Sequence, residues 1–242
     1  MSEYGPESYG DKFAARYDAL HTMDPTTIVD CLEELAGGGR VLELGIGTGR
    51  IALPLRERGI EVHGVDASSK MIDVLRQKPG GEDISITIGD FADVTIDGEF
   101  SLIFIAFNTI FALLEQEDQL RCFRNVAAHL QPGGLFLIEA FVPDLSRFDR
   151  GQNVSTNRLE ETEAVLEASV HDPVHQRVDT HIVFLSDQGV EIFPLKLRYA
   201  WPSELDLMAR LGGLRLRDRW GGWEKALFTA ESGFHVSVYE AI

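Results

Sequence analysis

Glu43-Leu44-Gly45-Ile46-Gly47-Thr48-Gly49 is the stretch that decides the fold, because it puts three glycines between a short apolar run and a helix-patterned segment. Glycines at such a turn let the backbone approach a ligand with no Cβ in the way, and amides at the start of the following helix point toward that ligand. Dinucleotide-binding folds use a similar turn. The glycines alone therefore do not separate one adenosine-type cofactor from another.

Two charged residues distinguish this turn from the dinucleotide fingerprint G-x-G-x-x-G. The fingerprint needs a third small residue one position after Gly49, and the chain has Arg50 there. Glu43 lies two positions before the first glycine. A carboxylate there would repel a pyrophosphate and attract a cation. The turn therefore favours a cofactor that carries an ammonium and a sulfonium.

Two more acidic residues follow later strands. Asp66 ends an expected strand over 61–66, and a carboxylate at this place accepts hydrogen bonds from ribose hydroxyls in NAD and adenosyl sites alike. Gly89-Asp90-Phe91 follows the next expected strand, over 84–88. There the carboxylate of Asp90 could accept from an adenine amino group, with Phe91 beside the ring. Because open parallel sheets bind ligands at the carboxyl edge, these features predict one adenosine pocket.

The surrounding pattern predicts a doubly wound α/β sheet. From Val41 to Phe141, short β-branched runs alternate with helix-period stretches, as in βαβ units. After Pro143 the apolar period becomes two, which predicts an antiparallel β-meander with strands over 159–170, 176–185 and 190–200. A helix and a hairpin over 214–220 and 234–239 then complete the first sheet. We expect covering helices in 1–40, a core in 41–142 and 201–242, and an inserted meander in 143–200.

The composition and net charge limit the classes of binding partner that the protein can have. The 242 residues carry a formal net charge of -17, which disfavours nucleic acid and anionic membrane surfaces. The two cysteines have no metal-ligand spacing, and we expect no metal site. The acidic N-terminus, Met1 to Glu7, has no apolar core and no apolar run is long enough to span a bilayer, so a cytoplasmic protein is expected.

The chain resembles the class I S-adenosylmethionine-dependent methyltransferases. The resemblance rests on four motifs: Val41 to Gly49, Val65-Asp66-Ala67-Ser68 with Met71, Gly89-Asp90-Phe91, and Leu130-Gln131-Pro132-Gly133-Gly134. It implies a Rossmann-like seven-stranded sheet of order 3-2-1-4-5-7-6 with the last strand antiparallel. It also implies that S-adenosylmethionine is bound by Tyr17, Glu43, Gly45, Gly47, Gly49, Asp66, Ala67, Met71, Asp90, Phe91 and Ala106.

Outside the core, Tyr9-Gly10-Asp11 to Tyr17-Asp18-Ala19-Leu20-His21 is similar to the N-terminal helix of methyltransferases that alkylate aminosugars in actinobacterial antibiotic pathways. This likeness implies that the helix covers the cofactor, with Tyr17 near the sulfonium and Tyr9 toward the acceptor. It also implies a homodimer formed through the meander. Alternatively, both tyrosines simply pack the helix onto the sheet.

The acceptor side is less defined. Some aminosugar enzymes have a histidine shortly after the fourth strand, whereas this chain has Asn108-Thr109-Ile110-Phe111-Ala112 there. The candidates for the acceptor side are Tyr9, His21, Asn108 and Arg198, with His21 the one histidine expected to act as a base. Methyl transfer gains mainly from alignment and desolvation, so the lack of a triad does not exclude an enzyme.

The main hypothesis is methyl transfer from S-adenosylmethionine to an oxygen or nitrogen of a small, secondary-metabolite acceptor. An NAD(P)-dependent oxidoreductase is an alternative, which Arg50 disfavours. A non-catalytic S-adenosylmethionine-binding protein is another, which the covering helix with Tyr17 disfavours because a sensor needs no enclosed acceptor cavity.

Overall fold

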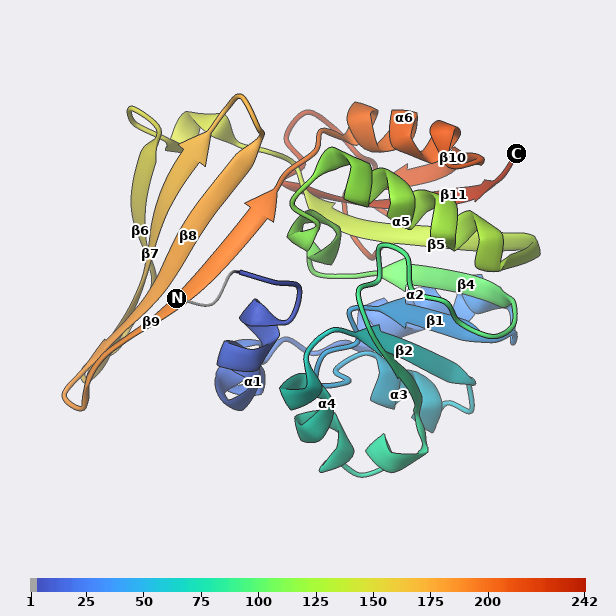
Figure 1. The fold of residues 1–242 in the computed structure, drawn as a ribbon, viewed down its shortest axis with the longest axis horizontal. Helices are drawn as coiled ribbons and strands as arrows, with labels where there is room; N and C mark the ends of the chain where they lie inside the picture. Colours follow the sequence, from blue (N-terminus) through green and yellow to red (C-terminus); the bar gives the residue numbers. More distant parts are fainter. Residues whose placement is uncertain (1–3) are drawn as a thin grey trace.

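The protein consists of a seven-stranded sheet with helices on both faces and a separate four-stranded sheet beside it (Figure 1). The computed structural model describes residues 4–242, so the first three residues of the expected N-terminal segment lie outside it. The helices are α1 (Ser8–Leu20), α2 (Thr26–Ala36), α3 (Ala52–Glu57), α4 (Ser69–Arg76), α5 (Gln116–His129) and α6 (Pro202–Leu211). The strands of the larger sheet are β1 (Val41–Leu44), β2 (Val62–Asp66), β3 (Ser85–Ile88), β4 (Phe100–Ile105), β5 (Leu130–Phe141), β10 (Leu214–Trp220) and β11 (Phe234–Ala241).

The strand order of the larger sheet is β3-β2-β1-β4-β5-β11-β10. Strands β1 to β5 are parallel, and β11 is antiparallel to both β5 and β10. Since β10 and β11 are the sixth and seventh strands of this sheet, the expected order 3-2-1-4-5-7-6 with an antiparallel last strand is confirmed.

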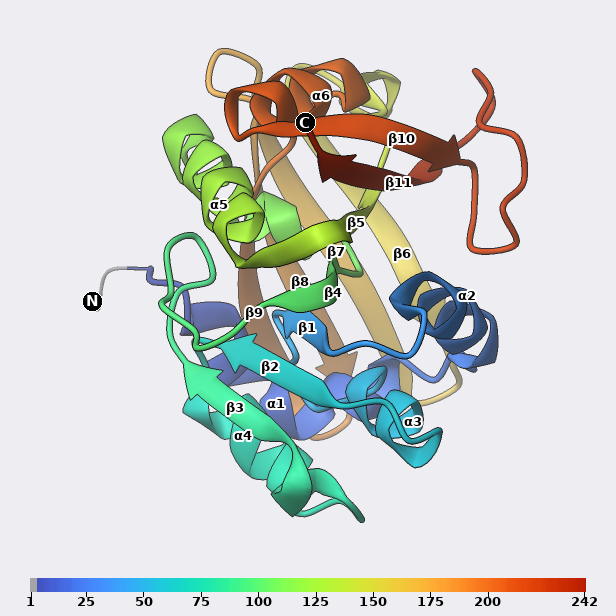
Figure 2. The same ribbon diagram turned by 90° about the vertical axis from the view of Figure 1, so that its right-hand side faces the viewer.

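Burial of both faces explains why β4 is apolar from Leu102 to Ile105. Leu102 and Phe104 face the core that α2 and α3 cover, whereas Ile103 and Ile105 face the core under α5 and α6. All four side chains are fully buried. A parallel sheet covered by helices on each side needs such continuous hydrophobic strands. Figure 2 shows α5 and α2 on opposite sides of the sheet.

The second sheet differs from the expected meander. It has four antiparallel strands in chain order: β6 (Gln152–Leu159), β7 (Glu163–Asp172), β8 (Arg177–Ser186) and β9 (Gly189–Arg198). The predicted strand over 159–170 is wrong at its start, because Leu159 ends β6 and residues 160–162 form the turn into β7. β6 escaped detection because it is polar and irregular, with Val154 and Leu159 both exposed and a bulge at Asn157.

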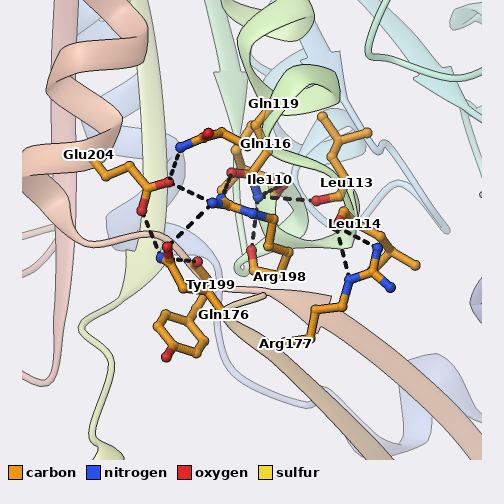
Figure 3. Close-up of polar contacts among 10 residues, drawn as sticks. All are labelled: Ile110, Leu113, Leu114, Gln116, Gln119, Gln176, Arg177, Arg198, Tyr199 and Glu204. Atoms are coloured by element: carbon orange, nitrogen blue, oxygen red, sulfur yellow. Dashed lines mark hydrogen bonds and ion pairs between the residues drawn. The ribbon is translucent and has the colours of Figure 1, made fainter. Parts of the chain in front are cut away.

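A buried polar network holds the second sheet against the first, near the end of β9 (Figure 3). Arg198 is 6% exposed; its Nη1 donates to Gln119 Oε1 at 2.7 Å and its Nη2 to Glu204 Oε1 at 2.7 Å. Gln119 Nε2 in turn donates to the carbonyl oxygen of Arg198 at 2.8 Å. From β8, Arg177 donates to the carbonyl oxygen of Leu114.

The expectation that Arg198 faces the acceptor is therefore corrected. Its guanidinium points between α5 and α6 because Glu204, at the start of α6, neutralises its charge there. The local sequence around Arg198 is the same whether its side chain faces the cavity or the helices. Its pairing with Glu204 depends on where α6 packs, which the local sequence does not show.

Replacing Arg198 should destabilise the protein strongly. In Arg198→Ala the carboxylate of Glu204, whose side chain is 16% exposed, loses its cation, which costs about 3–5 kcal/mol for a buried pair. Urea denaturation measures this loss. The matched control is Arg215→Ala, which breaks the exposed pair with Glu240 and should cost at most about 1 kcal/mol. Equal free energies of unfolding for the two variants would contradict the assignment.

Candidate active site

A cavity of about 670 Å³ lies where the carboxyl edge of the larger sheet, α1 and the inner face of the second sheet meet. The picture of the fold agrees, since α1 lies between β9 and α4 (Figure 1). Residues at or just after the ends of β1, β2 and β3, together with one residue of α4, line one part of the cavity: Gly45, Gly47, Asp66, Ala67, Asp90 and Phe91, with Met71 from α4. The other part is lined mainly by α1, the turn after β4 and strands β6 to β9.

The glycine turn has a backbone that requires glycine. Gly45, Gly47 and Gly49 have φ values of 80°, 54° and 79°, in the left-handed region. A Cβ on Gly45 would also lie 2.5 Å from Thr109 Cγ2. Gly45 and Gly47 line the cavity, whereas Gly49 faces Leu75 and is needed for the close packing of the turn.

Asp66 ties the turn to the second strand. Its Oδ2 accepts from the Gly47 amide and its Oδ1 from the Ser68 amide, each at 2.8 Å. Burial raises the pKa of Asp66, although these amide bonds act in the opposite direction. The carboxylate is thus fixed in place at the cavity wall before any ligand arrives.

Asp90, Phe91 and Met71 form the adjoining wall. Asp90 Oδ1 accepts from the Ala92 amide at 2.9 Å, and within residues 4–242 its Oδ2 has no hydrogen-bond donor. Met71 and Phe91 are buried, at 3% and 8% exposure, and both contribute to the cavity lining. Ser68 caps α4 by accepting from the Met71 amide, which fixes Met71 at this edge. This wall therefore combines two buried apolar side chains with one carboxylate oxygen that has no donor in the described part of the chain.

Polar contacts hold α1 over the glycine turn. Asp18 accepts from Thr48 Oγ1 and pairs with Lys78, both at 2.6 Å. At the other end of α1, Ser68 Oγ donates to Asp11 at 2.7 Å. Arg50 Nη1 donates to the carbonyl oxygen of His21 at 2.7 Å. In the sequence, Arg50 is the residue that disfavours a dinucleotide-binding turn. In the structure, its side chain anchors the end of the covering helix α1.

Tyr9, Tyr17 and His21 of the N-terminal segment all line the cavity. Burial raises the pKa of both tyrosines, that of Tyr17 to about 12, so their hydroxyls stay protonated at neutral pH. Burial lowers the pKa of His21, and its Nδ1 lies 2.9 Å from the Tyr17 carbonyl oxygen. Donation by Nδ1 to that carbonyl leaves Nε2 of a neutral ring as a proton acceptor.

The turn after β4 has an unusual backbone. Phe107 and Asn108 have φ values of 52° and 64°, a conformation that costs about 1–3 kcal/mol per non-glycine residue. Glu139 holds it by accepting from the Phe107 amide at 2.7 Å, and Asn108 Oδ1 accepts from the Phe141 amide at 2.6 Å. Phe107 and Asn108 line the cavity, whereas Ala106, expected at the methyl group, packs in the core on the α2 side.

Glu43 is 4% exposed at the end of β1 and does not itself line the cavity. Among residues 4–242 its Oε2 has no hydrogen-bond partner, and burial raises its pKa well above the usual range. Arg50 Nη2, from the same turn, is likewise buried without a hydrogen-bond partner in that part of the chain. Two polar atoms at the glycine turn, a carboxyl oxygen and a guanidinium nitrogen, are therefore buried without a hydrogen-bond partner among the described residues.

Sequence reasoning missed the wall that the second sheet contributes. Its inward-facing residues alternate with outward-facing ones, and period two was visible in the sequence, but nothing local showed which face meets the cavity. The residues that this wall adds to the cavity are Asn157, Arg158, Val165, Glu167, Ile182, Leu195 and Leu197.

Comparison with known proteins identifies the family. Residues 41–134 match the methyltransferase domain family. The chain is 31% identical over 204 residues to the cypemycin N-terminal methyltransferase of a Streptomyces species, a match that covers 84% of this chain and 83% of that protein. The chain therefore belongs to the methyltransferase family, and it is an S-adenosylmethionine-dependent enzyme of that family.

Solved structures agree over nearly the whole chain. The CcbJ methyltransferase from Streptomyces caelestis is 41% identical with a TM-score of 0.93, covering 98% of this chain and 99% of that one. The sugar N-methyltransferase KedS8 from Streptoalloteichus has the same fold, with a TM-score of 0.67 at 19% identity over 98% of this chain and 96% of its own. The second sheet is thus part of the shared fold.

Loss of the Asp66 carboxylate should weaken cofactor binding. A charge-assisted hydrogen bond contributes about 1.5–3 kcal/mol, so Asp66→Ala should raise the Kd of S-adenosylhomocysteine about tenfold to a hundredfold. Isothermal titration calorimetry measures the change. Asp97→Ala, at an exposed loop position, is the control and should bind as the unmodified protein does. Unchanged affinity in Asp66→Ala would refute the placement of the ribose.

Proposed function

We propose that this enzyme transfers the methyl group of S-adenosylmethionine to an amine nitrogen of a small natural-product acceptor. The observation that carries the proposal is the continuous cavity, which joins the pocket of Asp66 and Asp90 to a second part walled by α1 and the second sheet. A volume of about 670 Å³ is in the range of small-molecule sites. It suits a cofactor together with a compact acceptor.

The cavity residues fit this cofactor. In our proposal Asp66 accepts from the ribose hydroxyls, Asp90 Oδ2 accepts from the adenine amino group, and Met71 and Phe91 contact the adenine. Gly45 and Gly47 surround the methionine portion. Glu43 Oε2 and Arg50 Nη2 are buried at this turn and have no hydrogen-bond partner among residues 4–242.

S-adenosylmethionine, when bound, would supply a methyl group on a positively charged sulfur: the acceptor nitrogen would form a bond to the methyl carbon as the C–S bond breaks, and S-adenosylhomocysteine would leave. The residues of this chain then need to align the acceptor and exclude water. α1 does both, because Tyr9 and Tyr17 line the cavity while Phe13 fills the space toward the second sheet. His21, neutral through burial, is our candidate to take the proton that the amine must lose.

The acidic lining of the cavity and the similarity to an N-terminal methyltransferase both favour a nitrogen acceptor. Asp66, Asp90, Asp118 and Glu167 line the cavity, so anionic acceptors are disfavoured, as is nucleic acid by the net charge of -17. The 31% identical relative is by name an N-terminal methyltransferase. Both this relative and CcbJ come from Streptomyces, which supports a role in natural-product biosynthesis.

We place the enzyme in the cytoplasm. Cys31 and Cys122 are buried free thiols, which suits a reducing compartment. Among residues 4–242, no helix is both long and apolar enough to cross a membrane.

We also propose a homodimer through the segment 143–200. The outer face of the second sheet, turned away from α1, carries exposed apolar side chains: Val154, Val170, Val190 and Ile192, at 70%, 57%, 62% and 55% exposure. Val154 is diagonal to Val170 across β6 and β7, and Val190 lies two residues before Ile192 on β9, so the face carries two pairs of exposed apolar side chains. Exposed apolar patches often mark protein–protein interfaces. A second copy of the same face, related by a two-fold axis, would cover it.

The proposed reaction has a direct test. The enzyme is incubated with methyl-labelled S-adenosylmethionine and an actinobacterial metabolite extract, and the products are located by mass spectrometry. We expect label on amine nitrogens. Label found only on hydroxyl oxygens would refute the nitrogen assignment, and no incorporation in spite of tight cofactor binding would refute the transfer itself.

A charged residue on the outer face should break the dimer. Ile192→Glu puts a carboxylate into the proposed interface, so light scattering should give the 26.9 kDa monomer where the unmodified protein gives twice that mass. Leu227→Glu, at an exposed apolar residue far from that face, should stay dimeric. A monomeric unmodified protein would contradict the proposal.

A further inference from the structure

Glu167 stands out among the residues of the second sheet. It lies in the middle of β7, directly opposite Ile182 of β8, and both residues line the cavity. Its Oε1 accepts from Asn157 Nδ2, at the bulge of β6, at 2.8 Å. Among residues 4–242 its Oε2 has no hydrogen-bond donor and no Lys, Arg or His nitrogen within 4.0 Å. Glu167 therefore has one carboxylate oxygen fixed by Asn157 and no cationic partner among the described residues.

The other carboxylates of the cavity are already satisfied or assigned. Asp66 accepts from two backbone amides, and Asp90 belongs to the proposed adenine pocket. Asp118 pairs with Arg121 at 2.8 Å. The one arginine in the lining, Arg158, pairs with Glu163. The charge of Glu167 is thus the one that the protein leaves uncompensated on the acceptor side of the described cavity.

The surroundings make this charge significant. Val165 and Ile182 flank Glu167 on the inner face, and both pack in a cluster with Phe13 of α1. Glu167 itself is partly exposed and lines the cavity, so an ammonium in the cavity can reach its carboxylate. Tyr9 lies near enough that the charge of Glu167 contributes to the raised pKa of its hydroxyl. A carboxylate beside an aromatic ring suits an ammonium, since both attract cations.

We propose that Glu167 is a specificity-determining residue that binds a protonated amine of the acceptor and so selects basic amines over isosteric alcohols. This inference rests on the proposed function, because it assumes that the acceptor occupies this part of the cavity. It concerns binding and positioning, and no proton transfer by Glu167 is part of it. Asn157 has the role of holding one carboxylate oxygen so that the other faces the cavity.

The test uses a matched pair of probes, cyclohexylammonium and cyclohexanol, which have the same ring and differ in charge. Calorimetry measures the binding of each to the protein saturated with S-adenosylhomocysteine. We expect the unmodified protein to prefer the ammonium, and Glu167→Gln to bind it at least tenfold more weakly, as for a lost hydrogen bond to a charged group. Cyclohexanol affinity should not change.

Two controls separate this effect from damage to the fold. Glu167→Gln keeps the shape of the side chain and should bind S-adenosylhomocysteine as before. Glu161→Gln removes a carboxylate from the exposed β6–β7 turn and should keep the preference for the ammonium. Equal loss of both probes in Glu167→Gln, or no preference for cyclohexylammonium in the unmodified protein, would overturn the proposal.

The labelled-methyl assay distinguishes this inference from the proposed function. If the unmodified enzyme and Glu167→Gln methylate an amine with the same KM, the proposed function stands and the role of Glu167 is refuted. If the unmodified enzyme methylates only hydroxyl oxygens, the proposed function itself is refuted, and with it the basis of this inference. An increase in KM with little change in kcat supports the binding role of Glu167.

Discussion

The buried charge of Arg198 is the constraint on which the architecture depends. It lies where the second sheet meets α5 and α6, and its partners Gln119 and Glu204 belong to the helices that cover the larger sheet. A guanidinium enclosed in this way has one low-energy arrangement, because every displaced donor would remain unsatisfied. The angle between the two sheets is thereby fixed, and with it the space that both enclose.

The two halves of that space are built on different principles. The part near the glycine turn is made by backbone geometry, since Gly45 must leave room for Thr109 and Asp66 is locked by two amides. The part near the second sheet is made by side chains, with apolar residues around Glu167. Backbone geometry tolerates little change, whereas a side-chain wall changes with single substitutions. This division suits an enzyme family with one cofactor and many acceptors.

The sequence was sufficient to predict those parts of the cavity that are marked by a short motif next to a strand. Asp66 ends a strand, and the glycine turn and Asp90 each follow one within a few residues; a parallel sheet brings such positions together at one edge. β6 was missed because its apolar residues are exposed and its pattern is broken at Asn157. Arg198 and Ala106 were misplaced for another reason: the direction of each side chain depends on packing partners far along the chain. Glu167 gave no local signal at all.

α1 contacts the glycine turn, the start of α4 and the second sheet. Gly10 approaches Ser68 so closely that a Cβ would lie 2.5 Å from its Cβ, Asp18 is bound to Thr48 and Lys78, and Arg16 pairs with Glu191 of the second sheet. One helix is therefore a wall of both parts of the cavity. A displacement of α1 would open both parts to solvent together.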